Sequence, residues 1–228
     1  MSKKNRLKNK KTKLSKNDNS KTIMTLTRSD SIDSWFQAYD LIKKMTPENI
    51  KTFESFDSYF GIEKYGFFIV NFLYDFDEEL YNEGLDDLNK MLKRAEMAKW
   101  VHNHFSEEDE LNLGNFRNYE AESLWIIGKR DKAKKIFEDT IEIFPNFAYG
   151  YIYYGDQYWL SDWSYQHGAD YERAEAIYRM ALENPQIDHY GDVEERMEDL
   201  TKEKMNPEDR VHIAKIRLQL IQKRIGIA

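Results

Sequence analysis

Residues 144–159 read FPNFAYGYIYYGDQYW, and this stretch decides which fold the chain adopts. Tyr151, Tyr154 and Tyr158 recur at the spacing of one face of an α-helix, and Gly155 lies on the same face. A glycine inside a helix costs about 1 kcal/mol relative to alanine, but it lets another backbone approach closely. The stretch therefore predicts a helix that packs tightly against a neighbour.

A second apolar face with the same spacing follows after a polar connection. It consists of Tyr171, Ala174, Tyr178 and Ala181, and Pro185 stops the chain behind it. An earlier pair of helices shows the same order, with Arg117 to Trp125, a turn at Gly128, and then Ala133, Phe137, Thr140 and Pro145. Two successive helical pairs, each ending at a proline, predict a repeated architecture.

These positions resemble the tetratricopeptide repeat, whose first helix carries large residues around a glycine and whose second carries Ala, an aromatic residue and a final Pro. The matching residues of the second pair are Tyr151, Tyr154, Gly155, Tyr158, Ala174, Tyr178 and Pro185. The first pair departs at Arg117 and Glu120, where large apolar residues are expected. The resemblance implies an all-α fold, a tetratricopeptide-like α-α solenoid of antiparallel helical hairpins.

The spacing between the repeats is longer than usual. Ala133, Ala174 and Ala214 stand at equivalent positions and are 41 and 40 residues apart. The usual repeat is about 34 residues long, so the later hairpins are expected to contain longer internal loops.

A closer resemblance is to the helical-repeat module of bacterial proteins that often carry a zinc-binding SEC-C motif. Those proteins show a similar PxWGWGWIGWGDxYWL signature, which residues 145–160 match with Tyr in place of most of the Trp. The zinc motif itself is absent because the chain has no Cys. A function that depends on that zinc is therefore not carried over, and we expect no metal and no cofactor.

The sequence divides into three parts. Residues 1–27 are polar, basic and poor in apolar side chains, which predicts a disordered arm. Residues 28–105 are predicted to form an N-terminal helical region, a degenerate repeat. Residues 106–228 are predicted to form the tetratricopeptide-like repeats and a C-terminal capping helix.

Charge is distributed unevenly along the chain. Residues 1–22 hold nine of the 34 Lys and Arg and one of the 41 Asp and Glu, so the remainder holds 25 basic and 40 acidic residues. We call the following residues the basic arm: Lys3, Lys4, Arg6, Lys8, Lys10, Lys11, Lys13 and Lys16. Such an arm binds nucleic acid, a ribosome or an acidic protein, or it is a solubilising or self-docking tail. The sequence favours neither alternative.

No catalytic motif is present. The glycines form no phosphate-binding loop, there is no G-x-S-x-G turn, and there is no Cys nucleophile. His102 and His104 are two residues apart and point to different sides of a helix, so we interpret them as polar residues at a fraying helix end. The acidic residues from Asp192 to Asp199 are interpreted as a solvated face. We therefore expect a protein that is not an enzyme.

The expected location is the cytoplasm. The chain has no Cys, which fits a reducing compartment, and no apolar segment follows the basic N-terminal residues as in a signal peptide. The longest apolar run is about ten residues, too short for a membrane span.

The expected function is binding of another protein or peptide segment. In tetratricopeptide arrays the first helices line a concave groove, and the resemblance assigns to that groove Tyr119, Glu122, Trp125, Ile126, Tyr149, Tyr153, Asp156 and Trp159. Trp125 and Trp159 would be the anchors, and Glu122 and Asp156 would select positive charge. The alternative is that half of these rings are core between repeats. Binding of nucleic acid or a ribosome through the basic arm is the competing function.

Overall fold

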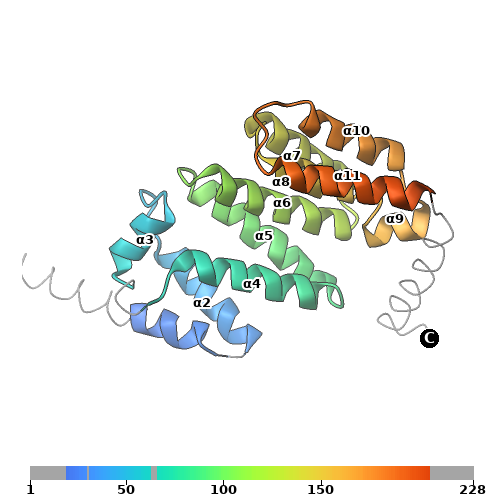
Figure 1. Ribbon diagram of the computed structural model, residues 1–228. Coiled ribbons are helices and arrows are strands. Elements are labelled where there is room, and N and C mark those ends of the chain that lie inside the picture. The colour runs from blue at the N-terminus through green and yellow to red at the C-terminus, as the bar shows by residue number, and fades with distance from the viewer. Residues whose placement is uncertain (1–18, 30, 63–65, 206–228) are drawn as a thin grey trace, which may run out of the picture. The chain divides into compact units, whose positions relative to one another are not determined.

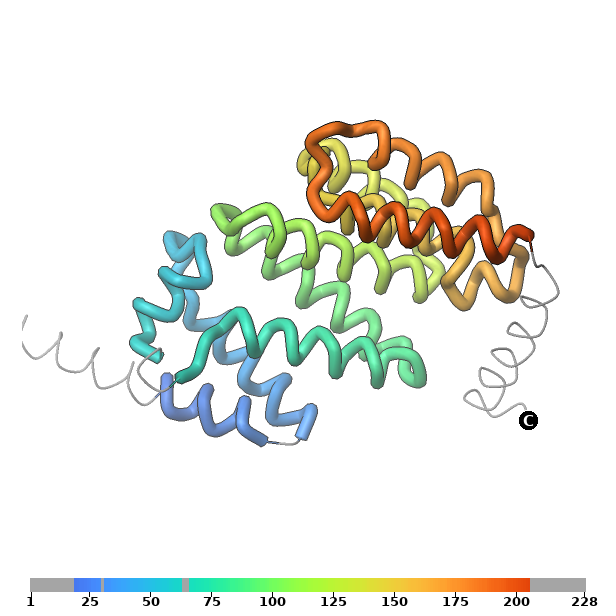
Figure 2. Tube along the Cα trace, in the orientation of Figure 1, coloured from blue at the N-terminus to red at the C-terminus, as the bar shows by residue number. Residues whose placement is uncertain are grey.

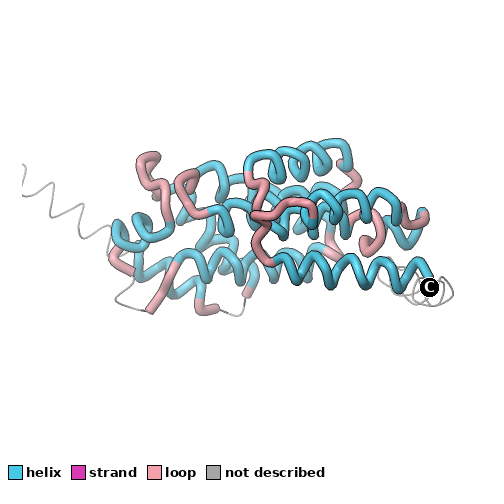
Figure 3. Tube along the Cα trace, turned by 45° about the horizontal axis from the view of Figure 1, so that its top comes forward, coloured by secondary structure: helices cyan, strands magenta, loops and turns pink. Residues whose placement is uncertain are grey.

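The computed structural model describes residues 19–29, 31–62 and 66–205, and every regular element within these ranges is a helix (Figure 1). The predicted all-α class is confirmed for this part of the chain, in which helices are joined by loops and turns (Figure 3). The elements are α2 (Ile32–Met45), α3 (Phe53–Phe60), α4 (Ile69–Gly84), α5 (Leu88–His104), α6 (Glu110–Ile126), α7 (Arg130–Ile143), α8 (Ala148–Asp156), α9 (Asp162–His167), α10 (Tyr171–Leu182) and α11 (Tyr190–Met205).

The chain forms two compact units. The first contains the described residues up to Glu79 together with His104–Glu108, and the second contains Leu80–Asn103 and the described residues from Asp109 onward. The division predicted at residue 105 thus falls inside a segment of the first unit. Most of α5 belongs to the second unit because its side chains, such as Arg94, bind α6.

The first unit begins earlier than the sequence indicates. Residues 19–27 are helical, Ile23 is fully buried, and the hydroxyl of Ser20 donates a hydrogen bond of 3.0 Å to the carbonyl of Phe60. The prediction of a disordered arm is therefore wrong for residues 19–27, because the apolar side chains of this short segment find a core to enter. Residues 1–18, which contain the basic arm, lie outside the described residues.

Aromatic rings form much of the core of the first unit. Phe76 of α4 is surrounded by rings from α2 and by Phe72, with centroids 5.2 to 6.2 Å apart. At the start of α3, Thr52 and Ser55 form a capping box, and Gly61 ends that helix in the left-handed conformation (φ 59°). The buried Asp57 accepts a hydrogen bond of 3.0 Å from the backbone N–H of Ile69, which ties α3 to the start of α4.

In the second unit, successive helices pack against one another. Helix α6 packs against α7, and α8 packs against α10, with the short α9 in the connection between them. Helix α11 runs beside α10 and α8 (Figure 2). One continuous core joins these helices, and it contains the motif residues Ala133, Phe137, Tyr151, Tyr154, Ala174, Tyr178 and Ala181.

The closest approach in this core is between α8 and α10. A Cβ atom added to Gly155 would lie 2.2 Å from Cε1 of Tyr178, so the phenol ring occupies the space that any side chain at this position would need. The sequence predicted that the backbone of another helix packs against Gly155, whereas the structure places the ring of Tyr178 there. A second contact of this kind occurs where Phe147 packs over Gly114 of α6, with a distance of 2.4 Å to the added Cβ.

Replacing Gly155 with alanine is expected to lower the free energy of unfolding by about 1–3 kcal/mol. The helix propensity of alanine favours the variant by about 1 kcal/mol, but the clash with the enclosed ring of Tyr178 outweighs it. Urea unfolding monitored by circular dichroism measures the difference. Gly191→Ala is the control, because Gly191 lies within α11 and nothing stands within 4 Å of the added Cβ, so its stability should be unchanged or slightly higher. Equal losses in both variants would contradict the assignment.

Candidate functional site

The two tryptophans of the predicted groove are interior residues. Trp125 is 4% exposed and Trp159 is 2% exposed, and the indole N–H of Trp159 donates a hydrogen bond of 2.7 Å to the hydroxyl of Tyr178. Helix α8 is contacted by α6, α7, α10 and α11, and most of its residues are buried. The prediction that these tryptophans are exposed anchors for a partner is therefore wrong.

The three tyrosines and the isoleucine of the predicted groove remain partly accessible to solvent. Tyr119, Tyr149, Tyr153 and Ile126 are all partly exposed. The rings of Tyr119 and Tyr153 contact each other across α6 and α8 with centroids 6.1 Å apart. The hydroxyl of Tyr149 donates a hydrogen bond of 2.6 Å to Asp192 of α11. The structure thus brings Tyr119 and Tyr153 together and leaves the three tyrosines partly exposed, whereas the two tryptophans are buried.

Glu122 is already neutralised by the protein itself. Its carboxylate lies 2.7 Å from Nη1 of Arg94, whose side chain is only 3% exposed and also reaches the hydroxyl of Ser123 at 3.3 Å. The guanidinium group lies over the rings of Tyr81 and Tyr119, at 4.8 and 5.0 Å from their centroids. Glu122 is therefore a structural acceptor for a buried cation, and it is not free to select a charged partner.

Asp156 also has internal partners. It accepts a hydrogen bond of 2.5 Å from Tyr178 of α10 and lies 3.3 Å from Nε of Arg196 of α11. Burial raises the pKa of Asp156 to about 6, while Arg196 and the bond from Tyr178 act to lower this pKa and Glu122 acts to raise it. The side chain of Asp156 is about one-fifth exposed, and burial of the rest of it is the largest cause of the raised pKa. Asp156 thus ties three helices together.

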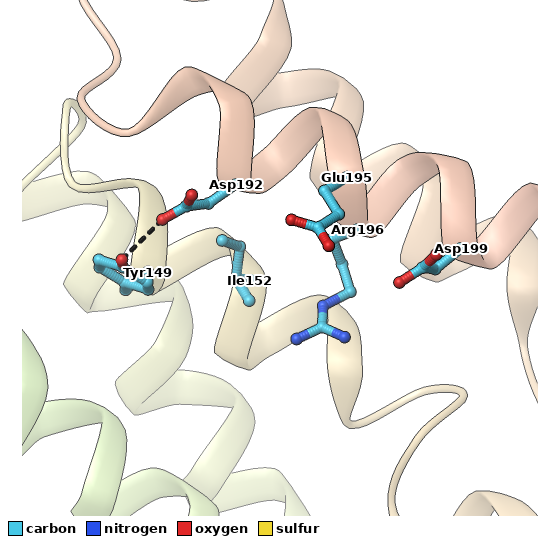
Figure 4. Close-up of a pocket in the computed structure, with 6 residues that line it drawn as sticks. All are labelled: Tyr149, Ile152, Asp192, Glu195, Arg196 and Asp199. Carbon is cyan, nitrogen blue, oxygen red and sulfur yellow. Dashed lines mark hydrogen bonds between the residues drawn. The ribbon is translucent and has the colours of Figure 1, made fainter.

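A hollow of about 240 Å³ lies between α8 and α11 (Figure 4). Its lining residues are Tyr149, Ile152, Asp192, Glu195, Arg196 and Asp199. Tyr149 and Ile152 come from α8, and the four charged residues follow one another along α11, so that three carboxylates and one guanidinium group face an aromatic and an aliphatic side chain across the hollow (Figure 4). A cationic side chain fits this arrangement, because its alkyl stem packs on the ring while its charge meets the carboxylates.

Sequence reasoning interpreted the carboxylates of the hollow only as a solvated face. A usable signal was present, because Asp192, Glu195 and Asp199 follow at i, i+3 and i+7 and share one side of a helix. Of the predicted groove residues, only Tyr149 lines the hollow. The sequence could not predict that α11 lies beside α8, and the hollow depends on this packing.

Metal ligands were not expected, and within the described ranges no group of three or more His, Asp and Glu side chains is placed to hold a metal ion. His102 is buried and its Nε2 lies 2.7 Å from a carboxylate oxygen of Glu120. It is therefore an interior polar contact, and the interpretation of His102 as a residue at a fraying helix end is wrong. In the same part of the chain no helix is long and apolar enough to span a membrane.

Comparisons of the chain with protein-family models, with curated proteins and with solved structures give no match. In its described residues the protein is an all-α protein with an acidic hollow between two packed helices.

Replacing Asp156 with asparagine is expected to remove part of the pH dependence of stability. An aspartate with a raised pKa keeps its proton in the folded chain while the unfolded chain, with a pKa near 3.8, has already lost it. The wild type should therefore lose on the order of 2 kcal/mol of unfolding free energy as the pH rises from about 4 to about 6, relative to the variant. Urea unfolding across this pH range measures the difference.

The control for this experiment is Glu194→Gln, which removes an exposed carboxylate from α11 outside the hollow. Its stability should follow that of the wild type at every pH. If Asp156→Asn also runs parallel to the wild type, the ionisation of Asp156 contributes nothing to the pH dependence.

Proposed function

We propose that the chain is a non-catalytic protein-interaction module built as a tetratricopeptide-like solenoid of antiparallel helical hairpins. Helices α6 and α7 are the first hairpin, α8 and α10 the second, and α11 begins the third. Support comes from the pairwise packing of these helices and from the complete burial of Ala133, Phe137, Ala174 and Tyr178, which stand at the repeat's small and aromatic positions. The signature shared with SEC-C-associated bacterial proteins supports the same architecture.

The proposed binding site is the acidic hollow between α8 and α11, and its occupant is a Lys or Arg side chain of a partner segment. The observation that carries this proposal is that Asp192, Glu195 and Asp199 of α11 line one hollow together with Tyr149 of α8, whose hydroxyl donates a hydrogen bond to Asp192. Arg196 is the single cation of the lining, and Asp156 lies 3.3 Å from it, so it neutralises little of this charge. The excess of acidic residues after residue 22 favours the approach of a basic partner.

The size of the hollow also favours a side chain over a cofactor. Sites for small molecules usually measure about 300–1,000 Å³ and enclose most of their ligand. The hollow here is about 240 Å³, and its lining holds charged groups around only two apolar side chains. Tyr119 and Tyr153 give further partly exposed aromatic surface in the same unit, on which a longer segment could pack. The cytoplasm is the location we propose, on the absence of Cys.

Replacing Glu195 with lysine is expected to weaken binding of an oligolysine peptide by about five- to tenfold, because one attractive charge in the hollow becomes repulsive. Isothermal titration calorimetry at low salt measures the affinity. Glu194→Lys is the matched control, since it changes the net charge equally on the same helix but does not line the hollow. A similar weakening in both variants would mean that the peptide senses only net charge, and the hollow would not be the site.

A second candidate function is nucleic-acid or ribosome binding through the basic arm. The observation that favours it is the concentration of nine Lys and Arg in residues 1–22 of an otherwise acidic chain. Clustered cations bind phosphate backbones by releasing counterions, which makes the affinity strongly dependent on salt.

Replacing all eight residues of the basic arm with glutamine should abolish binding of single-stranded RNA to the full chain. In the wild type the logarithm of the affinity should fall linearly with the logarithm of salt concentration, by about 0.7 per phosphate contacted. Fluorescence anisotropy of a labelled oligonucleotide measures both effects. RNA binding that survives the substitutions, or that salt leaves unchanged, would exclude this function for the arm.

A further inference from the structure

Trp163 of α9 is the centre of a second cluster, away from the residues that line the acidic hollow. The guanidinium carbon of Arg130 lies 4.5 Å from the centroid of its ring, and the imidazole of His167 stacks on it at 5.0 Å with an interplanar angle of 16°. Trp125 meets the same ring edge-on at 6.1 Å. Trp163 is partly exposed and His167 is exposed, so the cluster reaches the surface.

Two hydrogen-bond donors in this cluster have no acceptor. The indole Nε1 of Trp125 and the Nε of Arg130 are both buried and make no hydrogen bond to any described residue. Trp125 as a whole is 4% exposed. In contrast, the indole of Trp159 donates to the hydroxyl of Tyr178. Buried donors are nearly always paired, so two unpaired donors that contact one ring indicate a place for an acceptor.

The surroundings supply positive charge and no anion for these donors. Arg130 forms no ion pair with any carboxylate of the described residues, and burial lowers the pKa of its guanidinium group. Arg130 is also the first residue of α7, and Lys129 at the N-cap provides no side-chain acceptor for the N–H groups of the first turn. Trp125 contacts the ring of Trp163, which offers only a π-face, and the ring of Tyr158, whose hydroxyl donates to the hydroxyl of Tyr154.

A second arginine extends this positive charge. Arg173 of α10 lies over the ring of Tyr158, 5.1 Å from its centroid, and the Tyr158 ring in turn contacts Trp125 with centroids 5.3 Å apart. Its guanidinium group and that of Arg130 therefore each rest on a ring that touches Trp125. A guanidinium group held on an aromatic face keeps its charge and its N–H donors, which form strong hydrogen bonds with carboxylate or phosphate oxygens.

We propose that the Trp125, Arg130 and Trp163 cluster is a binding site for an oxyanion, the phosphate or carboxylate group of a ligand. The Nε–H of Arg130 and the indole N–H of Trp125 donate to its oxygens beside the partly exposed ring of Trp163. This site is independent of the acidic hollow and selects the opposite charge, so it stands whether or not the hollow binds a basic segment.

The indole N–H resonance of Trp125 tests the proposal in the full-length protein. Titration with inorganic phosphate or with acetate, at constant ionic strength made up with chloride, is followed by proton–nitrogen correlation NMR. The five tryptophans give five indole signals, assigned by Trp→Phe variants. We expect a saturable downfield shift of the Trp125 signal and little change at Trp159, which is already hydrogen-bonded. A response to phosphate alone, to acetate alone or to both supports the site and identifies the source of the oxyanion.

Arg130→Gln is expected to lower the anion affinity measured at the Trp125 signal by at least about tenfold, because a charge-assisted hydrogen bond is lost. Arg179→Gln is the matched control, since Arg179 is an exposed arginine that pairs with Glu175 on α10, and it should leave the affinity unchanged. An unaltered Trp159 signal shows that each variant is folded. The absence of a saturable shift with either anion, or equal affinities for Arg130→Gln and the wild type, would overturn the proposal.

Discussion

The contact of the Tyr178 ring with Gly155 is the constraint on which the second unit depends. It sets how closely α10 approaches α8, and it buries a phenol whose hydroxyl must then find polar partners. Those partners are the indole of Trp159 and the carboxylate of Asp156, which in turn lies beside Arg196 of α11. One steric contact between two helices therefore places the third helix, and with it the charged side of the acidic hollow.

Most aromatic side chains of this unit pack in its own hydrophobic core. Trp125 and Trp159 have the size and position of binding anchors in the sequence, but each is enclosed by neighbouring helices. Glu122 likewise forms an ion pair with Arg94, whose buried positive charge requires a partner. What remains at the surface is chemically different from the groove that the sequence predicted, with tyrosines in place of tryptophans and the carboxylates of α11 in place of those of α6 and α8.

The two candidate sites differ in how they are built. In the hollow, the carboxylates of Asp192, Glu195 and Asp199 repeat along one side of α11. Near Trp163, two buried donors have no acceptor among the described residues, and the guanidinium group of Arg130 packs on the Trp163 ring. The two proposed sites therefore differ in the charge of the ligand that each is proposed to bind.

The sequence by itself determined the helical class and the pairing of motif residues in the core, because the spacing of Tyr151, Tyr154 and Gly155 is a local property that any helix expresses. It missed the helix at residues 19–27 and the hollow, since both depend on partners distant in the chain. Only the tertiary structure decided which rings are buried and which carboxylates line the hollow. The physical reason is that a helix has the same pattern of aromatic residues whether water or another helix covers that face. Whether the face is buried depends on the helix that packs against it, and that helix can lie far away in the sequence.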